Sequence, residues 1–201
     1  MSVTEELFAF DASYGGIVAG LDEAGRGPLA GPVVVACCIP GKEVIDGVND
    51  SKKVSEKKRE YLYEKIVATC MDYTVEIIDE KTIDEINILQ ATKRGMENCA
   101  KKLRIMPDII LIDAVKGLKM PCKSESVIKA DAKSYAVAAA SIIAKVTRDR
   151  IMRAADEKYP VYGFIRNKGY GSAEHIRALR EYGPCPLHRR TFIRNFTDEQ
   201  T

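Results

Sequence analysis

Three short apolar stretches of the sequence each end in an aspartate. GIVAGLD ends at Asp22, DIILID at Asp113 and SVIKAD at Asp131. Glu23 follows the first of them directly. In an open α/β sheet, ligands collect where the ends of neighbouring strands open into a crevice. Carboxylates gathered there repel one another unless a cation neutralises them, and their oxygens suit Mg²⁺ or Mn²⁺ better than zinc. The pattern favours a divalent-metal site, although each aspartate alone is also typical of a turn or a helix N-cap.

Other catalytic arrangements have less support in the sequence. The two histidines, His175 and His188, lie away from the aspartates along the chain and are too few for a three-histidine zinc site. Ser51 and Ser134 have no histidine in their motifs, so we expect turn or capping roles for both rather than nucleophilic ones. We interpret His175, in a helix that Ser172 begins, as a structural residue.

Basic residues are concentrated near one end of the chain. Residues 1–50 carry two basic and eight acidic side chains, whereas residues 145–195 carry twelve basic and five acidic ones. The formal net charge of the whole chain is only +2. Such an asymmetry can present a cationic surface to a polyanion, although solvated lysines on helix faces also explain many basic runs. Metal-binding carboxylates beside cationic side chains are the arrangement of two-metal phosphodiester chemistry.

Strands and helices in alternation must position these residues. Apolar stretches predict strands at residues 16–22, 32–39, 73–78, 108–113 and 126–131. Helices are predicted at about 55–70, from a capping box of Thr82 and Glu85 to about 103, at 134–158 and at 172–182. This order indicates an α/β layer fold. We expect a catalytic domain at residues 1–158 and a helical appendage at 159–201 that packs on the same domain.

The composition excludes several classes of protein. The chain has 201 residues, 46% hydrophobic and 30% charged, which is typical of one globular domain. Its longest apolar runs, near 33–39 and 136–144, fall far short of the ~18 residues that cross a bilayer. The amino terminus is acidic and lacks the apolar segment of a signal peptide, and the six cysteines include no CxxC pair. We therefore expect a cytoplasmic protein with reduced thiols and no membrane partner.

Five local motifs carry a resemblance to a known family. They are LDEAGRGPLAGPVV (21–34), DSKKVS (50–55), LIDAVKG (111–117), KADAKSYAVAAASIIAKVTRDR (129–150) and NKGYGS with the histidine at 175 (167–175). Together they resemble bacterial ribonuclease HII, the type 2 ribonuclease H, in order from about residue 16 to about residue 192. The combination of DEAGRG near the amino terminus with DAKS and ASIIAKVTRD downstream is highly specific for that family.

The resemblance implies a fold and a metal site. The fold is the α/β ribonuclease H-like fold, a mixed five-stranded sheet of order 3-2-1-4-5 flanked by helices, with a helical carboxy-terminal segment. The metal site has four carboxylates, which fall on Asp22, Glu23, Asp113 and Asp131. Two Mg²⁺ or Mn²⁺ ions there would activate a water for attack on phosphorus and stabilise the departing 3′ oxygen. The products expected from this chemistry carry 5′-phosphate and 3′-hydroxyl ends.

The resemblance also implies the substrate. In the family the loop Gly25-Arg26-Gly27 reads the ribose 2′-hydroxyl, and Tyr170 matches a tyrosine that stacks on the following deoxyribose. Spacing alone favours a plain tight turn for this loop. The expected substrates are RNA/DNA hybrids and duplex DNA with a single ribonucleotide, nicked on its 5′ side, and a monomer is the expected state. Candidates for phosphate contacts come from two motifs: Lys52, Lys53, Lys145, Thr147 and Arg148.

Three alternatives stay open at this point. Ribonuclease HIII usually has an extra amino-terminal domain and a glutamate where this chain has Asp131. A binding module that has lost catalysis is disfavoured, because clustered carboxylates without a function cost stability. An integrase-like or Holliday-junction nuclease is disfavoured by the loop at 25–27 and by Tyr170. Two departures from the family pattern, Asn167 before KGYG and Ala130 in KADAKS, leave all four carboxylates in place.

Overall fold

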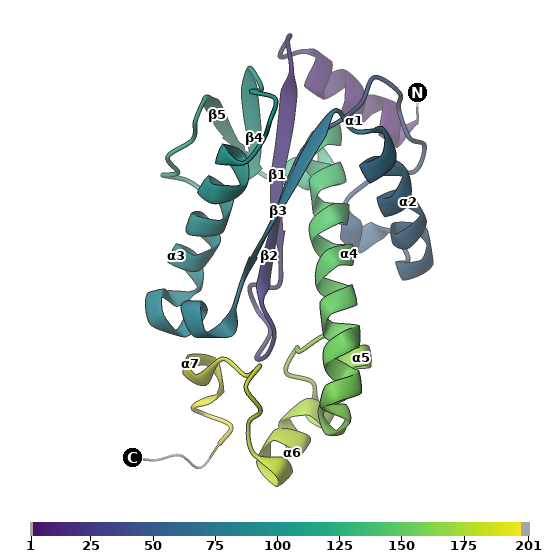
Figure 1. Cartoon of the computed structure of the whole chain (residues 1–201). Coiled ribbons are helices and arrows are strands. Elements are labelled where there is room, and N and C mark those ends of the chain that lie inside the picture. Colours follow the sequence, from purple (N-terminus) through teal and green to yellow (C-terminus); the bar gives the residue numbers. More distant parts are fainter. Residues whose placement is uncertain (1, 198–201) are drawn as a thin grey trace.

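A mixed sheet of five strands forms the centre of the protein in the computed structural model, which describes residues 2–197 (Figure 1). The strands are β1 (Val18–Ala24), β2 (Val33–Ile39), β3 (Asp72–Ile78), β4 (Ile109–Asp113) and β5 (Lys123–Val127). Their order is β3-β2-β1-β4-β5. The pairs β1–β2 and β2–β3 are antiparallel, whereas β1–β4 and β4–β5 are parallel. The predicted α/β fold and strand order are confirmed.

Helices lie on both sides of this sheet (Figure 1). The α-helices are α1 (Val3–Ala12), α2 (Glu56–Thr69), α3 (Glu80–Lys101), α4 (Tyr135–Lys158), α5 (Phe164–Asn167), α6 (Ala173–Tyr182) and α7 (Arg190–Ile193). Three short 3-10 turns are η1 (Ser51–Lys53), η2 (Ala130–Ala132) and η3 (Pro160–Tyr162). None of the helices in residues 2–197 is long and apolar enough to span a bilayer.

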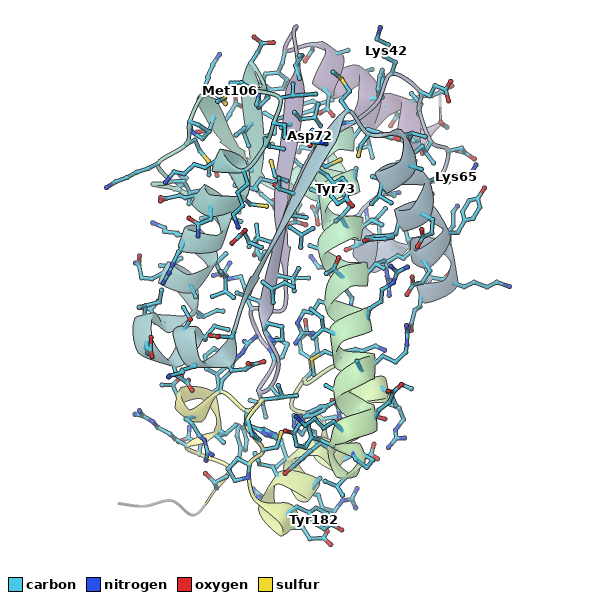
Figure 2. All side chains as sticks on the ribbon, viewed as in Figure 1. Lys42, Lys65, Asp72, Tyr73, Met106 and Tyr182 are labelled. Carbon is cyan, nitrogen blue, oxygen red and sulfur yellow. The ribbon has the colours of Figure 1, made fainter. Side chains whose placement is uncertain are left out.

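Strand β2 shows how the two faces are filled. All seven of its residues are buried, because successive side chains point to opposite faces and both faces are covered. Val34 and Cys38 share a cluster with α2 and α4, whereas Val35 and Cys37 pack with Met96 on α3. Side chains fill the space between the ribbons on both sides of the sheet (Figure 2). The two clusters together hold the sheet between α3 and α4.

The start of α4 is fixed by a close contact with β1, a hydrogen bond to α1 and its own N-cap. A Cβ on Gly20 of β1 would collide with the main chain of Ala136 and Val137, so only glycine allows this approach. The Asp11 carboxylate of α1 accepts a hydrogen bond from the Ala136 N–H at 2.7 Å. Ser134 is the N-cap, and its hydroxyl accepts from the Val137 N–H. These contacts position the chain that leads from Asp131 into α4.

Two sequence predictions about the elements were wrong, and one helix was not predicted. The last strand ends at Val127, and Asp131 lies in η2, because Lys129 adopts a left-handed conformation (φ 56°) that breaks the extended chain. Helix α3 begins before the predicted capping box, since Asp79 is the N-cap and accepts from the Thr82 N–H. Helix α1 was not predicted. The predicted N-caps Ser55 and Ser172 are confirmed.

The carboxy-terminal segment lies at the end of α4 (Figure 1). Its residues Tyr162 and Phe164 pack with Ala30 and Met152, and Ile193 packs with Leu29. The segment is therefore joined to the loop between β1 and β2 by two apolar clusters. The domain boundary at residue 158 stays a prediction, and the last four residues of the predicted appendage, 198–201, lie outside the described part of the chain.

Candidate active site

The central parallel strands place two of the carboxylates side by side. Strand β1 pairs with β4 in register, with Leu21 opposite Ile112, so Asp22 and Asp113 follow that pair directly. Asp113 is the last residue of β4, whereas Asp22 lies two residues before the end of β1. Glu23 comes next on the same strand. The predicted strand-end position therefore holds for Asp113 and nearly holds for Asp22.

The third aspartate reaches the same place by a different route. Asp113 Oδ1 accepts a hydrogen bond from the Ala130 N–H at 2.9 Å, which docks η2 beside the end of β4. Asp131 follows Ala130 in that turn, and its Oδ2 lies 3.6 Å from Lys52 Nζ of η1. Asp131 is thus positioned by a turn that Asp113 itself holds, instead of by the end of a strand.

Repulsion and burial act on this carboxylate cluster, which consists of Asp22, Glu23, Asp113 and Asp131. Asp22 is only 8% exposed, and burial raises its pKa well above the usual value, with the charge of Glu23 as the next cause. Burial also raises the pKa of Glu23, although Arg26, 3.5 Å away, acts against this. Burial and then the charges of Asp50 and Asp113 raise the pKa of Asp131. The cluster carries more negative charge than its neighbours neutralise.

The donor set fits a hard divalent cation. Its ligands are all carboxylate oxygens, which Mg²⁺ and Mn²⁺ prefer over the nitrogen and sulfur of zinc sites. Glu23 Oε2 is buried and has no hydrogen-bond partner within the described part of the chain, so it is an oxygen that a cation would satisfy. Within residues 2–197, no three His, Cys, Asp or Glu side chains are already drawn together as a metal shell. The carboxylates therefore fit the ion in their chemistry.

A cavity of about 220 Å³ connects this cluster to most of the other predicted site residues. It is lined by Asp22, Glu23, Ala24, Gly25, Arg26, Gly27, Ser51, Lys52, Lys145, Arg148 and Tyr170. Asp113 and Asp131 adjoin it through the contacts just described. Lys53 and Thr147 do not line it. The structure therefore brings residues from four separate motifs to one concave surface.

In the loop at residues 25–27, the first position needs glycine for two separate reasons. Gly25 has φ 98°, a left-handed conformation, and a Cβ there would collide with the Arg148 side chain. A Cβ on Gly27 would lie 3.7 Å from Cε1 of Tyr170, so the exposed tyrosine ring stands directly beside this glycine. The main chain of the loop and the face of Tyr170 are thus neighbours at one side of the cavity.

The predicted phosphate contacts fall into two groups. Lys52 is 80% exposed at its side chain, and Lys53 is exposed, so both are available to a polyanion. Lys145 Nζ lies 2.6 Å from Asp149 Oδ1. Arg148 differs from its prediction because it is 1% exposed and donates to the carbonyls of Ala30, Pro32 and Lys168. Thr147 also differs, since its Oγ1 is buried. Arg148 joins segments at the wall of the cavity, whereas Thr147 Oγ1 has no hydrogen-bond partner among the described residues.

Two histidines and an arginine were missed as parts of this site. The rings of His175 and His188 meet at 3.0 Å between their Nε2 atoms, and both are buried. His175 Nδ1 donates to the Tyr170 carbonyl and His188 Nδ1 accepts from the Cys185 N–H. One arrangement of protons satisfies all three bonds, with both rings neutral. Arg189, which is fully buried, contacts the carbonyls of the loop at 25–27. The sequence analysis predicted a structural role for His175, and the basic character of residues 145–195 gave no indication of a separate role for His188 or Arg189.

Comparison with known proteins gives the family. A model of the Ribonuclease HII family matches residues 19–195. A ribonuclease HII from Acetivibrio thermocellus is 54% identical over 90% of this chain and 71% of its own length. The chain belongs to the ribonuclease HII family. A relative in this family from Caldicellulosiruptor saccharolyticus is 50% identical over 89% of this chain and 87% of its own. As a member of the family, the protein is an enzyme, a ribonuclease H hydrolase.

Solved structures agree with this assignment. The crystal structure of ribonuclease H2 from Pyrococcus horikoshii OT3 has a TM-score of 0.76 and 34% identity, covering 89% of this chain and 96% of that one. A ribonuclease HIII crystallised with Mn²⁺ has a TM-score of 0.69 at 19% identity, covering 94% and 69%, which shows a shared fold. The ribonuclease HII family match decides between the two types and sets aside the HIII alternative.

Proposed function

We propose that this enzyme cleaves the RNA strand of RNA/DNA hybrids and nicks duplex DNA on the 5′ side of a single embedded ribonucleotide. The observation that carries the proposal is the single cavity in which buried carboxylates adjoin the loop at 25–27 and Tyr170. Charged oxygens at one side suit hydrolysis of a phosphodiester, and main-chain amides beside an aromatic ring suit a sugar. Hydrolysis of the phosphodiester and recognition of the sugar can therefore take place at adjacent positions.

Four carboxylates of this chain would hold the metal: Asp22, Glu23, Asp113 and Asp131. Two Mg²⁺ or Mn²⁺ ions supply, when bound, an activated water and stabilisation of charge at the phosphate. The chain itself keeps the ligand oxygens buried and crowded, so that cation binding relieves their repulsion. Asp113 also orients η2, and through it Asp131. Products with 5′-phosphate and 3′-hydroxyl ends are proposed.

The substrate would lie along the cavity with its sugars toward the loop and the tyrosine. Gly25 and Gly27 have no side chains, so their main chain can approach a ribose 2′-hydroxyl closely. Tyr170 is 49% exposed and can stack on the neighbouring deoxyribose. Lys52, Lys53 and Lys145 would contact phosphates without reading sequence. We place this activity in the cytoplasm, in a monomer that acts in DNA replication and in excision of ribonucleotides from DNA.

The first experiment is a cleavage assay on a labelled DNA duplex with one ribonucleotide. We expect a nick on the 5′ side of the ribonucleotide with Mg²⁺ or Mn²⁺ and no product in EDTA. The same duplex with only deoxyribose is the matched control and should stay intact. Asp113→Asn should abolish cleavage while binding to a hybrid persists. If only long RNA tracts were cut, the carboxylate chemistry would stand and the proposed junction reading would be wrong.

A further inference from the structure

The buried guanidinium of Arg189 is surrounded by main-chain carbonyls. Its Nη1 donates to the Arg26 carbonyl at 2.8 Å, and its Nη2 donates to the Gly25 carbonyl at 2.6 Å. Nε and Nη2 both donate to the Gly31 carbonyl, at 2.9 and 2.7 Å. Arg189 is 0% exposed, and burial lowers its pKa to about 10. Because a buried cation with no function costs stability, this arrangement calls for an explanation.

The contacts determine which way two peptide groups of the loop face. No peptide bond in the described residues is cis, and in a trans peptide the C=O and the N–H point in opposite directions. The Gly25 carbonyl faces the guanidinium, so the Arg26 N–H faces away from it. The Arg26 carbonyl also faces the guanidinium, so the N–H of Gly27, in the same peptide group, points away from Arg189. Arg189 thus turns two consecutive amide donors outward from the protein interior.

These outward amides belong to residues that line the cavity. Within residues 2–197 neither N–H donates to another main-chain or side-chain group outside the strands. Gly27 also lies next to Tyr170, because a Cβ at this position would be in van der Waals contact with the tyrosine ring. A hydroxyl that entered between the loop and the ring would meet donors whose direction is already set.

We propose that Arg189 is a positioning residue for ribose selectivity, which holds the Gly25 and Arg26 carbonyls inward so that the following amides are presented to a sugar 2′-hydroxyl. The inference rests on the proposed function of the loop at 25–27. Arg189 has no hydrogen bond to any of the four carboxylates among the described residues, so it acts on the choice of sugar and not on hydrolysis. Arg189 donates from three separate nitrogens held in one plane, and the single ammonium nitrogen of a lysine cannot reproduce that spread.

The position of Arg189 is itself secured from two sides. Its N–H donates to the Leu29 carbonyl at 2.9 Å, and His188 forms a β-bridge with Ala30. Asp84 of α3 accepts hydrogen bonds from the main-chain N–H groups of Arg190 and Thr191, at 2.7 and 2.9 Å. The carboxy-terminal segment is therefore anchored to α3 immediately after the arginine. Loosening this anchor should weaken the support of the loop without touching Arg189.

The test measures binding in a variant that is expected not to cleave, so that hydrolysis does not affect the result. In an Asp113→Asn background with Mg²⁺, fluorescence anisotropy gives Kd for a duplex with one ribonucleotide and for the same duplex with only deoxyribose. We expect a clear preference for the ribonucleotide. Adding Arg189→Lys should reduce this preference at least tenfold, while Kd for the all-deoxyribose duplex stays within twofold. In the otherwise unchanged enzyme, the same substitution should lower kcat/KM at a single ribonucleotide.

Two further variants separate the possible outcomes. Leu62→Ala, in the buried cluster under α2, destabilises the fold by another route and should leave the preference unchanged. Asp84→Ala should reduce the preference about threefold, and it decides the matter if Arg189→Lys does not fold. An unchanged preference, or equal weakening for both duplexes, overturns the inference. If the Asp113→Asn protein itself shows no preference for a ribonucleotide, the proposed function fails instead.

Discussion

The carboxylate cluster and the support of the loop at 25–27 both bury charge, but they stabilise it differently. In the cluster, burial and the charge of Glu23 act together against the ionised form of Asp22. Under the loop, Arg148 and Arg189 are buried just as deeply, yet each donates to three backbone carbonyls. The carboxylate cluster lacks a balancing charge within the chain, as the proposed metal site requires, whereas the hydrogen bonds of the two arginines are satisfied within the chain. Chemistry and selectivity are thus assigned to regions with opposite electrostatic states.

The largest effect is expected from removing one charge of the cluster. Asp22→Asn should lower cleavage about 10³-fold, which corresponds to the several kcal/mol that bound metal contributes. It should also raise Tm in EDTA by a few degrees, because it relieves repulsion in the metal-free protein. The exposed Asp46 provides a matched control, and Asp46→Asn should change neither quantity. A lower Tm for Asp22→Asn would show that the cluster is not under repulsive strain.

The next effect concerns the neutral histidine pair beneath Tyr170. Burial, and then the charge of His175, lowers the pKa of His188 from 6.5 to about 4. Between these values the unfolded chain binds a proton that the folded protein does not. Stability is therefore present above pH 6.5 and is lost as the pH falls toward 4. The whole loss from this group is about 3 kcal/mol.

Urea unfolding between pH 7.5 and pH 4.5 measures this loss. His188→Gln should show a flatter profile than the unchanged protein. The difference between the two profiles cancels the contributions of other groups, such as Asp11, whose raised pKa of about 6 acts in the opposite direction. Parallel profiles would mean that the histidine pair does not stay neutral in the folded protein. The segment that holds Tyr170 would then contain a buried charge without a partner.

Tyr170 gives a smaller effect that is confined to the selective region. Tyr170→Ala should lower nicking at a single ribonucleotide by roughly tenfold to a hundredfold, which is the range expected if the ring contact with the sugar contributes as much as a stacked base does, about 1–3 kcal/mol. Cleavage within long RNA/DNA hybrids should fall much less, and Tyr170→Phe should retain most of the activity. Rates on the two substrates under identical conditions make the comparison. Equal losses on both would place Tyr170 with the cutting residues.

The smallest effect tests the buried acid at the start of α4. Asp11 Oδ2 accepts from the Ala136 N–H, and Oδ1 is buried without a hydrogen-bond partner among the described residues. Asp11→Asn keeps an acceptor and removes a buried charge, so stability at pH 7 should change by less than about 1 kcal/mol. Asp11→Ala leaves the Ala136 N–H unpaired and should cost about 1–3 kcal/mol. Urea midpoints at pH 7 distinguish the two, and equal midpoints would contradict this assignment.

What the sequence predicted correctly was encoded locally. The apolar run before Asp113 is a strand because its four isoleucine and leucine residues are buried between helices, and Ser55 and Ser172 cap helices through bonds to residues three positions away. Helix α1 carries a similar local signal, since Ser2 and Glu5 form a capping box. These features need no knowledge of distant parts of the chain.

What the sequence did not predict depends on distant contacts or on single dihedral angles. The left-handed Lys129 ended a strand that composition alone extended to Asp131. Arg148 lies in a basic motif, but its partners are loops 20 and 118 residues away. The pairing of His175 with His188 joins residues only 13 positions apart, but no motif in the sequence indicates that the two rings meet. Charge and periodicity indicate that such residues are polar and do not indicate what they contact.

The contact between Arg189 and the Arg26 carbonyl spans 163 residues of chain, and this separation has a consequence for protein synthesis. At about 5–20 residues per second, Asp131 is added roughly 3–12 s before Arg189, because 58 residues separate them. During that interval a nascent chain holds all four carboxylates while the loop at 25–27 lacks its contacts with Arg189. A translation product that stopped in this interval would keep the acidic ligands and lose the arginine. Synthesis therefore adds the four carboxylates of the proposed metal site first and Arg189, the proposed positioning residue, last.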